Sequence, residues 1–543
     1  MLEKLLNHRT KNITSAAFII LITTLIAKIL GLLRDRVLAG LFGAGDELDI
    51  YFAAFRIPDF LFNVLILGAI STAFIPVFAE YHLSSKEEAL RLSNNVLCIF
   101  LVILIFLGTI GVIFAPQLMH LITPGFKGEK FTEVVKLTRI MFLSPILLGV
   151  SNIFGSILQY FSHFFTYSLA PIMYNLGIIL GALFFVPKIG IEGLAWGVVL
   201  GAFLHLIIQL PTMFALGWRF KFSFDFSHKG TRKIFKLMVP RTIGLAASQI
   251  NLIAITAIAS LLSVGSIAVF NLANNLQYVP ISLFGISFAV AIFPSLSRNV
   301  VKKEKVKFLE DFTSAFSEIL FFALPVSLLF FLLRAQIVRI VLGTGQFSWQ
   351  DTRLTAASLG VFTFSIFAQS LIPLLSRAFY AFRDTKTPVK IGIFSILINI
   401  ALAAFFVWLL SFPNQFYYFC QLILDLKNIS GISVIGLPLA FSLSSIINLI
   451  WLLIAFKKRV GNNWDKKLGE AFLRILLLSL ICGGITFILL RPFSLIFDLH
   501  TFWGVFWEAA LSGGLGFAFY LGFAKILKFP EYETILESFF KKK

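Results

Sequence analysis

Charged residues lie within the first two long apolar runs of this chain, where lipid would tolerate them poorly. The first run, residues 14–42, contains four: Lys28, Arg34, Asp35 and Arg36. The second run, residues 50–78, contains Arg56 and Asp59. A charge held in hydrocarbon costs at least roughly 3 kcal/mol, so such side chains usually face a water-filled cavity and interact with a group of opposite sign. The excess of cations predicts a transporter for an anion.

The composition places most of the chain in a membrane. Of its 543 residues, 58% are hydrophobic and 13% are charged, and its mean hydropathy is +0.91. Soluble cores cannot bury that much apolar surface. Only helices and closed barrels span lipid with every backbone polar group satisfied, and the apolar runs are about 20 residues or longer. We therefore expect an all-α polytopic membrane protein. Its first helix should be retained, because no small-residue cleavage site follows the apolar run.

Cysteine usage and charge distribution exclude two classes. Cys98, Cys420 and Cys482 have no metal-ligand spacing and form no disulfide framework. The formal net charge is +19, but the basic residues form short clusters between apolar runs rather than one soluble face. We expect the anionic membrane surface, and not nucleic acid, as their partner.

Apolar runs separated by polar breaks predict about fourteen spans, with boundaries good to a few residues. These spans cover residues 14–42, 50–79, 93–116, 135–160, 164–186, 193–217, 234–263, 266–296, 308–333, 353–379, 387–411, 431–456, 468–490 and 500–526.

Lysine and arginine are concentrated in the N-terminal segment and in the even-numbered loops. The sixth loop is an example, with Arg219, Lys221, Lys229, Arg232 and Lys233. Odd-numbered loops are poorer in cations, and the first contains Asp46, Glu47 and Asp49. By the positive-inside rule, both termini are expected on the cytoplasmic side.

An internal repeat divides the chain. Residues 50–78 align with residues 268–296, and Pro76 matches Pro294 at an offset of 294 − 76 = 218. A second pair of segments, ending at Pro171 and Pro388, has an offset of 388 − 171 = 217. Two lobes with the substrate handled between them follow from such a repeat. We assign residues 1–217 to an N-lobe (spans 1–6), residues 218–456 to a C-lobe (spans 7–12), and residues 457–543 to a C-terminal helix pair (spans 13–14) with a cytoplasmic tail.

The deep cations have more than one interpretation. Lys28 and Arg34 are six residues apart and far from a common helical face, whereas Lys28 and Asp35 share one. Arg34 and Arg36, near the end of their run, either face a cavity or reach the interface and pair with Asp46, Glu47 or Asp49. Lys28 and Arg56 lie deeper, which favours a cavity-facing role.

The second lobe carries amides where the first carries charges. They are Gln249, Asn251, Asn271, Asn274, Asn275 and Gln277. Such side chains either hold helices together or line a cavity, where they would donate hydrogen bonds to sugar or amide groups.

The sequence contains no catalytic constellation. It lacks a Walker-type phosphate loop, a His-Glu-x-x-His motif and a nucleophile elbow. We expect no enzymatic activity and no cofactor. Coupling to the membrane potential, to a monovalent ion or to the substrate's own gradient would then supply the energy.

Four segments resemble the MurJ (MviN) lipid II flippases. They are GLLRDRVLAGLFGAGDELDIYFAAFRIPDF at 31–60, Gln249-Ile-Asn251 after Pro240, Phe-Pro-Ser-Leu-Ser at 293–297 and, most specifically, FYAFRDTKTPVK at 379–390. The resemblance spans nearly the whole chain. It implies a fourteen-helix transporter of the multidrug/oligosaccharidyl-lipid/polysaccharide exporter superfamily. It also implies that first-lobe cations contact a pyrophosphate and that the last two helices form a groove for a lipid tail.

The resemblance carries over to particular residues. Arg34 and Asp35 match the family's Arg-Asp pair, Asp49 matches its loop aspartate, and Lys28 replaces a first-helix arginine. Together with the deep cation and the second-lobe amides, the predicted substrate-binding residues are Lys28, Arg34, Asp35, Asp49, Arg56, Gln249, Asn251 and Asn275.

Three positions depart from the family's pattern. Phe62 and Asn275 stand where many members have arginine, and Leu67 stands where they often have glutamate. Either Lys28 and Arg56 compensate for these losses, or the chain carries a different polyprenyl-linked cargo.

The leading hypothesis is a lipid II flippase in a bacterial cytoplasmic membrane, acting as a monomer by alternating access, with cell-wall synthesis proteins as neighbours. Its expected cargo is undecaprenyl-pyrophosphoryl-disaccharide-pentapeptide or a related polyprenyl-pyrophosphate glycolipid. The alternatives are a flippase for another such oligosaccharide, a cation-coupled drug exporter and a non-transporting cell-wall scaffold.

Overall fold

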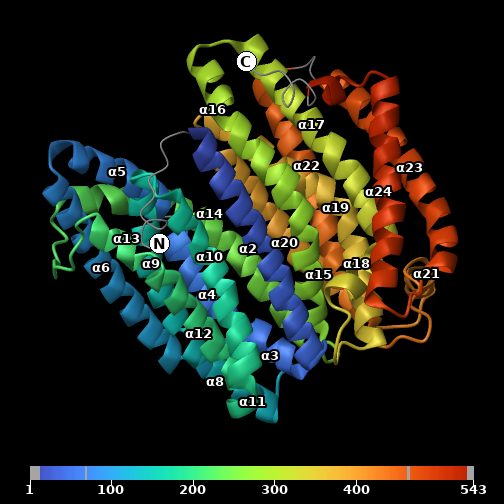
Figure 1. Ribbon diagram of the computed structural model, residues 1–543, viewed down its shortest axis with the longest axis horizontal. Helices are drawn as coiled ribbons and strands as arrows, with labels where there is room; N and C mark the ends of the chain where they lie inside the picture. The colour runs from blue at the N-terminus through green and yellow to red at the C-terminus, as the bar shows by residue number, and fades with distance from the viewer. Residues whose placement is uncertain (1–12, 68–69, 462–464, 535–543) are drawn as a thin grey trace. The chain divides into compact units, whose positions relative to one another are not determined.

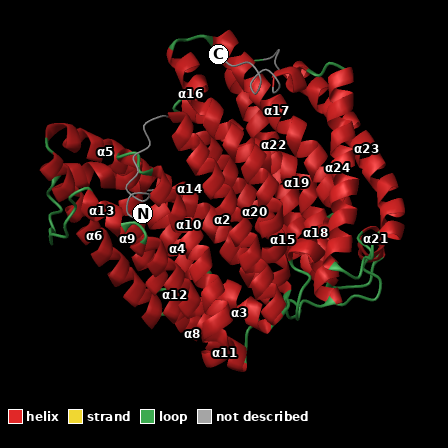
Figure 2. Cartoon of the chain, in the orientation of Figure 1, coloured by secondary structure: helices red, strands yellow, loops and turns green. Residues whose placement is uncertain are grey.

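The computed structural model describes residues 13–67, 70–461 and 465–534. The described residues form helices joined by loops and turns, without a strand among them (Figure 1, Figure 2). The chain divides into two compact units, residues 1–268 and 269–543. The all-α prediction is confirmed.

The first unit consists of helices that precede the division, which falls within α15. They are α2 (Ile13–Phe42), α3 (Asp46–Ala54), α4 (Arg56–Phe62), η1 (Asn63–Leu67), α5 (Ile70–Ser84), α6 (Lys86–Ile113), α7 (Ala115–Ile122), α8 (Gly128–Met141), α9 (Leu143–Tyr160), α10 (Phe164–Leu180), η2 (Gly181–Phe185), α11 (Val186–Ile189), α12 (Glu192–Ile207), α13 (Leu210–Ala215) and α14 (Lys229–Ser260).

The second unit contains most of α15 and the helices that follow it. They are α15 (Ser266–Pro280), η3 (Ile281–Ile286), α16 (Ser287–Val301), α17 (Lys305–Leu332), α18 (Arg334–Val341), α19 (Trp349–Ala381), α20 (Lys386–Leu409), α21 (Gln415–Ile423), η4 (Ile432–Ile435), α22 (Gly436–Val460), α23 (Asp465–Ile496) and α24 (Phe502–Ile526). The last two, red in Figure 1, pack against each other, and both contact α17.

Eleven helical segments among the described residues are long and apolar enough to span a membrane. They are Lys86–Ile113, Gly128–Tyr160, Phe164–Ile189, Glu192–Ala215, Ser266–Val301, Lys305–Leu332, Trp349–Ala381, Lys386–Leu409, Ile432–Val460, Leu468–Ile496 and Phe502–Ile526. The other three predicted spans fall on α2, on the series from α3 to α5, and on α14. The multi-pass fold is therefore confirmed, while the count of fourteen stays a prediction.

Two π-helical turns recur at equivalent positions of the sequence repeat. η1 and η3 begin 281 − 63 = 218 residues apart, which is the offset of Pro76 and Pro294. The helices that follow keep nearly the same spacing, since α6 and α17 begin 305 − 86 = 219 residues apart. Turns of this kind are rare and occur mostly as single bulges within α-helices. Their recurrence is a structural sign of the repeat.

The sequence repeat and the helix contacts assign α14 to different halves of the chain. The repeat places it at the start of the second lobe, but α14 packs against α4, α5, α6 and α7 of the first unit. The lobe boundary between residues 217 and 218 stays a prediction drawn from the repeat, because the contacts divide the chain after residue 268 instead.

Helices α10 and α12 approach closely at glycines. A Cβ atom added to Gly177 would lie 2.3 Å from the Cα of Gly201, and one added to Gly181 would lie 2.2 Å from the Cα of Gly197. Small residues at four-residue intervals allow membrane helices to pack backbone to backbone. Because α10 also packs on α2, this contact fixes the helix that brings Asn175 to the first-unit charges.

Candidate anion-binding site

Arg34 on α2 is held by two neighbours. Its Nη2 and Nε donate to Asp35 Oδ1 at 2.8 and 3.1 Å, and its Nη1 donates to Asn175 Oδ1 on α10 at 3.2 Å. The Asp35 side chain is only 5% exposed, whereas that of Arg34 is 22% exposed. The alternative in which Arg34 pairs with the acidic first loop is therefore wrong for this structure.

Arg56, the first residue of α4, is buried beside α14. Its Nε donates to Thr256 Oγ1 at 2.7 Å, and its side chain interacts electrostatically with Asp59 one turn further along α4. Asp59 interacts with Arg34 as well. The aspartate therefore links the cation of α2 to the cation of α4.

The charges of this site are balanced rather than purely cationic. Arg34 and Arg56 are accompanied by Asp35 and Asp59, and the ring of Tyr174 on α10 lies near Arg34. We call Arg34, Asp35, Arg56, Asp59 and Asn175 the charged cluster. Buried charges are normally paired. Across the two apolar runs, four cations still stand against two aspartates, so the expected excess of cations stays a prediction.

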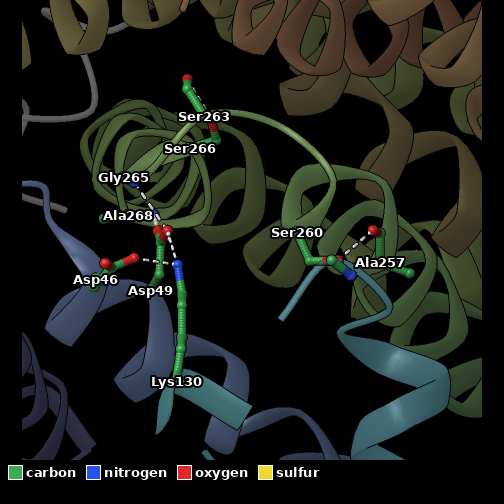
Figure 3. Close-up of polar contacts among 10 residues, drawn as sticks. Asp46, Asp49, Lys130, Ala257, Ser260, Ser263, Gly265, Ser266 and Ala268 are labelled. Atoms are coloured by element: carbon green, nitrogen blue, oxygen red, sulfur yellow. Dashed lines mark hydrogen bonds and ion pairs between the residues drawn. The ribbon is translucent and has the colours of Figure 1, made fainter. Parts of the chain in front are cut away.

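Asp49 occupies a separate position at the start of α3. Its Oδ2 and Oδ1 accept from the backbone N–H groups of Gly265 and Ala268 at 2.8 and 3.0 Å, and Oδ2 also accepts from Lys130 Nζ at 3.1 Å. Lys130 also pairs with Asp46 (Figure 3). The first N–H groups of a helix have no partner within the helix, and a carboxylate that accepts from them at this positive end stabilises the helix. Asp49 therefore holds the start of α15.

The remaining predicted first-unit residues are placed less specifically. Lys28 is half-buried on α2, seven residues before Asp35 and hence on the same helical face. Gln249 is half-buried and Asn251 is buried, both on α14, the helix that carries Thr256. The hydrogen bonds described above for Arg34 and Arg56 are made with other residues than these three.

The second unit contains a chain of neutral hydrogen bonds through α15, α19 and α22. Gln369 Nε2 donates to Gln277 Oε1 at 3.0 Å and to Ser365 Oγ at 2.9 Å, and Ser365 Oγ donates to Ser442 Oγ at 3.1 Å. Gln277 Nε2 donates in turn to Asn274 Oδ1 at 2.9 Å. We call these five residues the amide network. The interpretation of second-lobe amides as groups that hold helices together fits Gln277, which links α15 to α19, while Asn274 binds Gln277 within α15.

The three departures from the family pattern lie at different places. Phe62 is half-buried and packs against the first unit's apolar core. Leu67 is the last residue of η1, and its side chain lies outside the described residues. Asn275 is half-buried on α15, next in sequence to Asn274 of the amide network.

The most specific sequence segment, FYAFRDTKTPVK, forms the end of α19, a short turn and the start of α20. Asp384 in the turn accepts from the backbone N–H of Thr387 at 3.0 Å and from its hydroxyl at 2.8 Å. Burial raises the pKa of Asp384, but these bonds and the charge of Arg459 outweigh burial, so its pKa lies below the ordinary value. Asp384, one residue before the N-cap Thr385, thus binds the first turn of α20 through Thr387.

Sequence reasoning missed several members of these sites. Asn175, Thr256 and Lys130 were not among the predicted residues, because each lies far along the chain from its partner. Asp59 stood out as a charge in an apolar run, which was the one available signal.

Comparison with known proteins agrees with the fold and the motifs. A family described as lipid II flippase MurJ matches residues 38–503. A probable lipid II flippase MurJ of Vibrio cholerae is 29% identical over 538 residues, covering 95% of this chain and 97% of that protein. A probable lipid II flippase MurJ of Rickettsia prowazekii is 30% identical over 395 residues, covering 71% of this chain and 76% of that protein.

Solved structures give the same result. A structure of lipid II flippase MurJ in an inward closed conformation has a TM-score of 0.74 and 26% identity, covering 94% of this chain and 99% of that one. An inward-facing multidrug resistance MATE family transporter of the MOP superfamily, at 15% identity and a TM-score of 0.63 with 82% and 96% coverage, shares the fold. From the sequence match and the fold together, this chain belongs to the lipid II flippase MurJ family.

Proposed function

We propose that this protein is a lipid II flippase. It moves undecaprenyl-pyrophosphoryl-disaccharide-pentapeptide from the cytoplasmic to the periplasmic leaflet of a bacterial inner membrane, by alternating access and as a monomer. Family membership supports the cargo. The observation that supports the mechanism is a partly buried arginine whose hydrogen-bond partners a phosphate could replace.

Arg34 is suited to a pyrophosphate because a guanidinium presents several N–H donors in a planar fork, which can bind two phosphate oxygens in parallel. In the structure, those donors bind Asp35 and Asn175. A pyrophosphate oxygen would compete for the same N–H groups. The exchange of partners would keep the guanidinium paired before and after cargo binding.

The charged cluster also lowers the main barrier to translocation. Moving an ion from water into a medium of low dielectric constant costs of order 20 kcal/mol in the idealised limit. A pyrophosphate that remains among Arg34, Arg56 and Asn175 avoids that transfer, while the polyprenyl tail stays in lipid. We propose that no cofactor takes part and that the membrane potential or a monovalent ion supplies the energy.

A second candidate cargo is another polyprenyl-pyrophosphate oligosaccharide. Phe62 and Asn275 favour this candidate, because neutral residues stand where many relatives carry arginine. The pyrophosphate and the tail would be the same, and the sugar groups would differ.

Complementation tests the function. The chain is expressed in a strain depleted of its own lipid II flippase, beside variants Arg34→Ala and Lys302→Ala at matched membrane levels. Growth with the wild-type chain and with Lys302→Ala, but not with Arg34→Ala, is expected. Growth with Arg34→Ala would show that transport does not depend on this arginine. Failure of the well-expressed wild-type chain, with export of another polyprenyl-linked oligosaccharide, would support the second cargo.

The orientation has its own experiment. Single cysteines are introduced at three exposed loop positions, Gln346, Ser411 and Lys302, since the native cysteines are buried. With both termini in the cytoplasm, an impermeant thiol reagent added to intact cells should label positions 346 and 411 but not 302. Labelling at 302 alone would invert the topology.

A further inference from the structure

An aromatic segment of the first unit, residues 218–226, follows α13 and precedes α14. It has no regular secondary structure and reads Trp-Arg-Phe-Lys-Phe-Ser-Phe-Asp-Phe. Phenylalanines therefore alternate with polar residues, and in an extended chain alternate side chains point to opposite sides. In Figure 1 this segment belongs to the green loop beside α13 and α6.

Two buried asparagines near the start of α6 hold the backbone of this segment. Asn94 Nδ2 donates to the carbonyl of Arg219 at 3.0 Å, and Asn94 Oδ1 accepts from the N–H of Lys221 at 3.3 Å. Asn95 binds the backbone of Asp225 in the same two-sided way, at 2.8 and 2.7 Å. Each amide uses both its donor and its acceptor on one stretch of chain. The backbone of the segment is therefore held in a defined conformation by side-chain hydrogen bonds.

The side chains of the segment are sorted by these contacts. Ser223 faces α6, where its hydroxyl donates to Asn95 Oδ1 at 3.2 Å. The neighbouring Phe222 and Phe224 are 75% and 45% exposed, and their rings stack with centroids 6.4 Å apart. Phe226, 51% exposed, meets Phe224 edge to face at 5.1 Å. Three contacting rings thus point away from the protein.

Cations alternate with the phenylalanines of the segment in the sequence and follow them at the start of α14. Residues 218–233 contain one acidic residue, Asp225. The basic residues in the same range are Arg219, Lys221, Lys229, Arg232 and Lys233. Lys233 is occupied by an ion pair with Glu80 at 2.7 Å. Arg232 Nε donates to the backbone carbonyl of Phe226 at 3.1 Å, which places this cation at the end of the segment. The combination is apolar rings flanked by positive charge.

We propose that the aromatic segment binds anionic phospholipid at the membrane surface. Its phenylalanines would enter the boundary between headgroups and acyl chains, and its cations would bind lipid phosphates. This is the composition of interfacial membrane anchors. Two observations favour lipid over a protein partner: the charge is complementary to an anionic leaflet, and the segment begins at residue 218, just past the membrane span that ends at Ala215.

The proposed lipid site goes beyond the transport function and uses none of the charged cluster. It would fix the ends of α13 and α14 at the level of the headgroups. Its test therefore needs no cargo, and its failure would leave the flippase assignment untouched.

The depth of the segment is measured on the full chain in phospholipid nanodiscs without lipid II. A fluorescent label that responds to polarity is placed at Phe222→Cys and, as a control, at Lys302→Cys in another exposed loop. The label at 222 should emit at shorter wavelength and be quenched several-fold more by lipids spin-labelled near the headgroup. Equal quenching at the two positions overturns the proposal and would favour a protein partner for the exposed rings.

The charge requirement is measured separately, as the ratio of phosphatidylglycerol to phosphatidylcholine retained by the purified protein in native mass spectrometry. The double variant Lys221→Gln and Lys229→Gln should lower that ratio, by up to roughly fivefold per cation. Lys302→Gln should leave it unchanged. A ratio unaffected by the double variant overturns the assignment of these cations to lipid phosphates.

Asn95 is a positioning residue in this proposal. The variant Asn95→Ala removes the hydrogen bonds to Ser223, Asp225 and Thr231. The melting temperature should fall by a few degrees, and in the protein that stays folded the label at 222 should lose most of its quenching. Undiminished quenching in Asn95→Ala would show that the hydrogen bonds of Asn95 do not position the phenylalanine rings.

Discussion

Arg34 in the first unit and Gln369 in the second both link helices through side-chain hydrogen bonds, but only one of them is charged. Arg34 binds Asp35 and Asn175, and Gln369 binds Gln277 and Ser365. A neutral amide can be fully satisfied by other neutral groups inside a protein. A guanidinium in the same surroundings requires a carboxylate or another anion.

The difference supports the proposal that the cargo's phosphates bind at the charged cluster. The charged cluster can exchange a protein carboxylate for a ligand phosphate, whereas the amide network gains nothing from an anion. The contrast predicts that substitutions in the first unit remove transport, while those in the second lower stability.

The largest effect is expected at Arg34. Truncating one partner of a buried, hydrogen-bonded charge pair costs about 2–5 kcal/mol, so Arg34→Ala should reduce cargo affinity roughly 30-fold or more. Arg34→Lys should retain part of the activity, because an ammonium keeps the charge but not the planar fork. Binding of lipid II to purified variants measures both effects. Equal affinity of Arg34→Ala and the wild type would break the contrast between the units.

Arg56 should rank next. Arg56→Ala leaves Asp59 with one cation fewer, and transport should be strongly impaired at normal membrane levels. Thr256→Val removes only the hydroxyl that accepts from Arg56, at a cost of about 1.5 kcal/mol or roughly tenfold. Comparing the two in a transport assay separates the charge from its orientation. A silent Arg56→Ala would remove this residue from the site.

Lys28 tests how far the charged cluster extends along α2. Lys28→Ala should be strongly impaired if the cation shares the cargo face with Asp35, whereas Lys28→Arg should keep activity, since an arginine retains the positive charge. The measurement is growth of the flippase-depleted strain with each variant, compared at several expression levels. Full activity of Lys28→Ala would confine the site to the end of α2.

The amide network should show the opposite behaviour. Gln369→Leu leaves Gln277 and Ser365 without one hydrogen bond each, which costs about 1–3 kcal/mol of stability. The melting temperature should fall by a few degrees while transport per folded molecule is kept. Loss of transport without loss of stability would place the second unit in the cargo site and weaken the contrast.

The smallest effect is expected at Asp384, outside the spans. Its pKa is lowered in the folded protein, so its charge stabilises the fold above the unfolded pKa of about 3.9. That contribution is lost as the pH falls through the lower, folded pKa. Asp384→Asn should therefore melt slightly below the wild type at neutral pH and together with it at strongly acidic pH. An equal difference at both pH values would exclude titration of Asp384 as the cause.

The sequence predicted the parts of the fold that depend on local pattern. Apolar runs gave the helices, and the matching of Pro76 with Pro294 anticipated a repeat that reappears in η1 and η3. The interruption of the second run by a π-helical turn could not be predicted, because Asn63–Leu67 carries no residue specific to that geometry.

The site was predicted only in part, for a physical reason. Arg34 and Arg56 stood out because charges in apolar runs are costly, but their partners are neutral residues far along the chain. Asn175 is 141 positions from Arg34, and Thr256 is 200 positions from Arg56. Nothing in the local sequence of a neutral side chain records which charge it will meet.

Translocation of lipid II in proteoliposomes tests the central claim most directly. Purified wild-type protein and Arg34→Ala are reconstituted with lipid II, and a lipid II-cleaving enzyme that cannot cross the membrane is added outside. With the wild type, cleavage should continue beyond the outer-leaflet share of lipid II as molecules arrive from the inner leaflet. With Arg34→Ala, it should stop at that share. Cleavage beyond it at the wild-type rate in Arg34→Ala would contradict a transport mechanism built on the charged cluster.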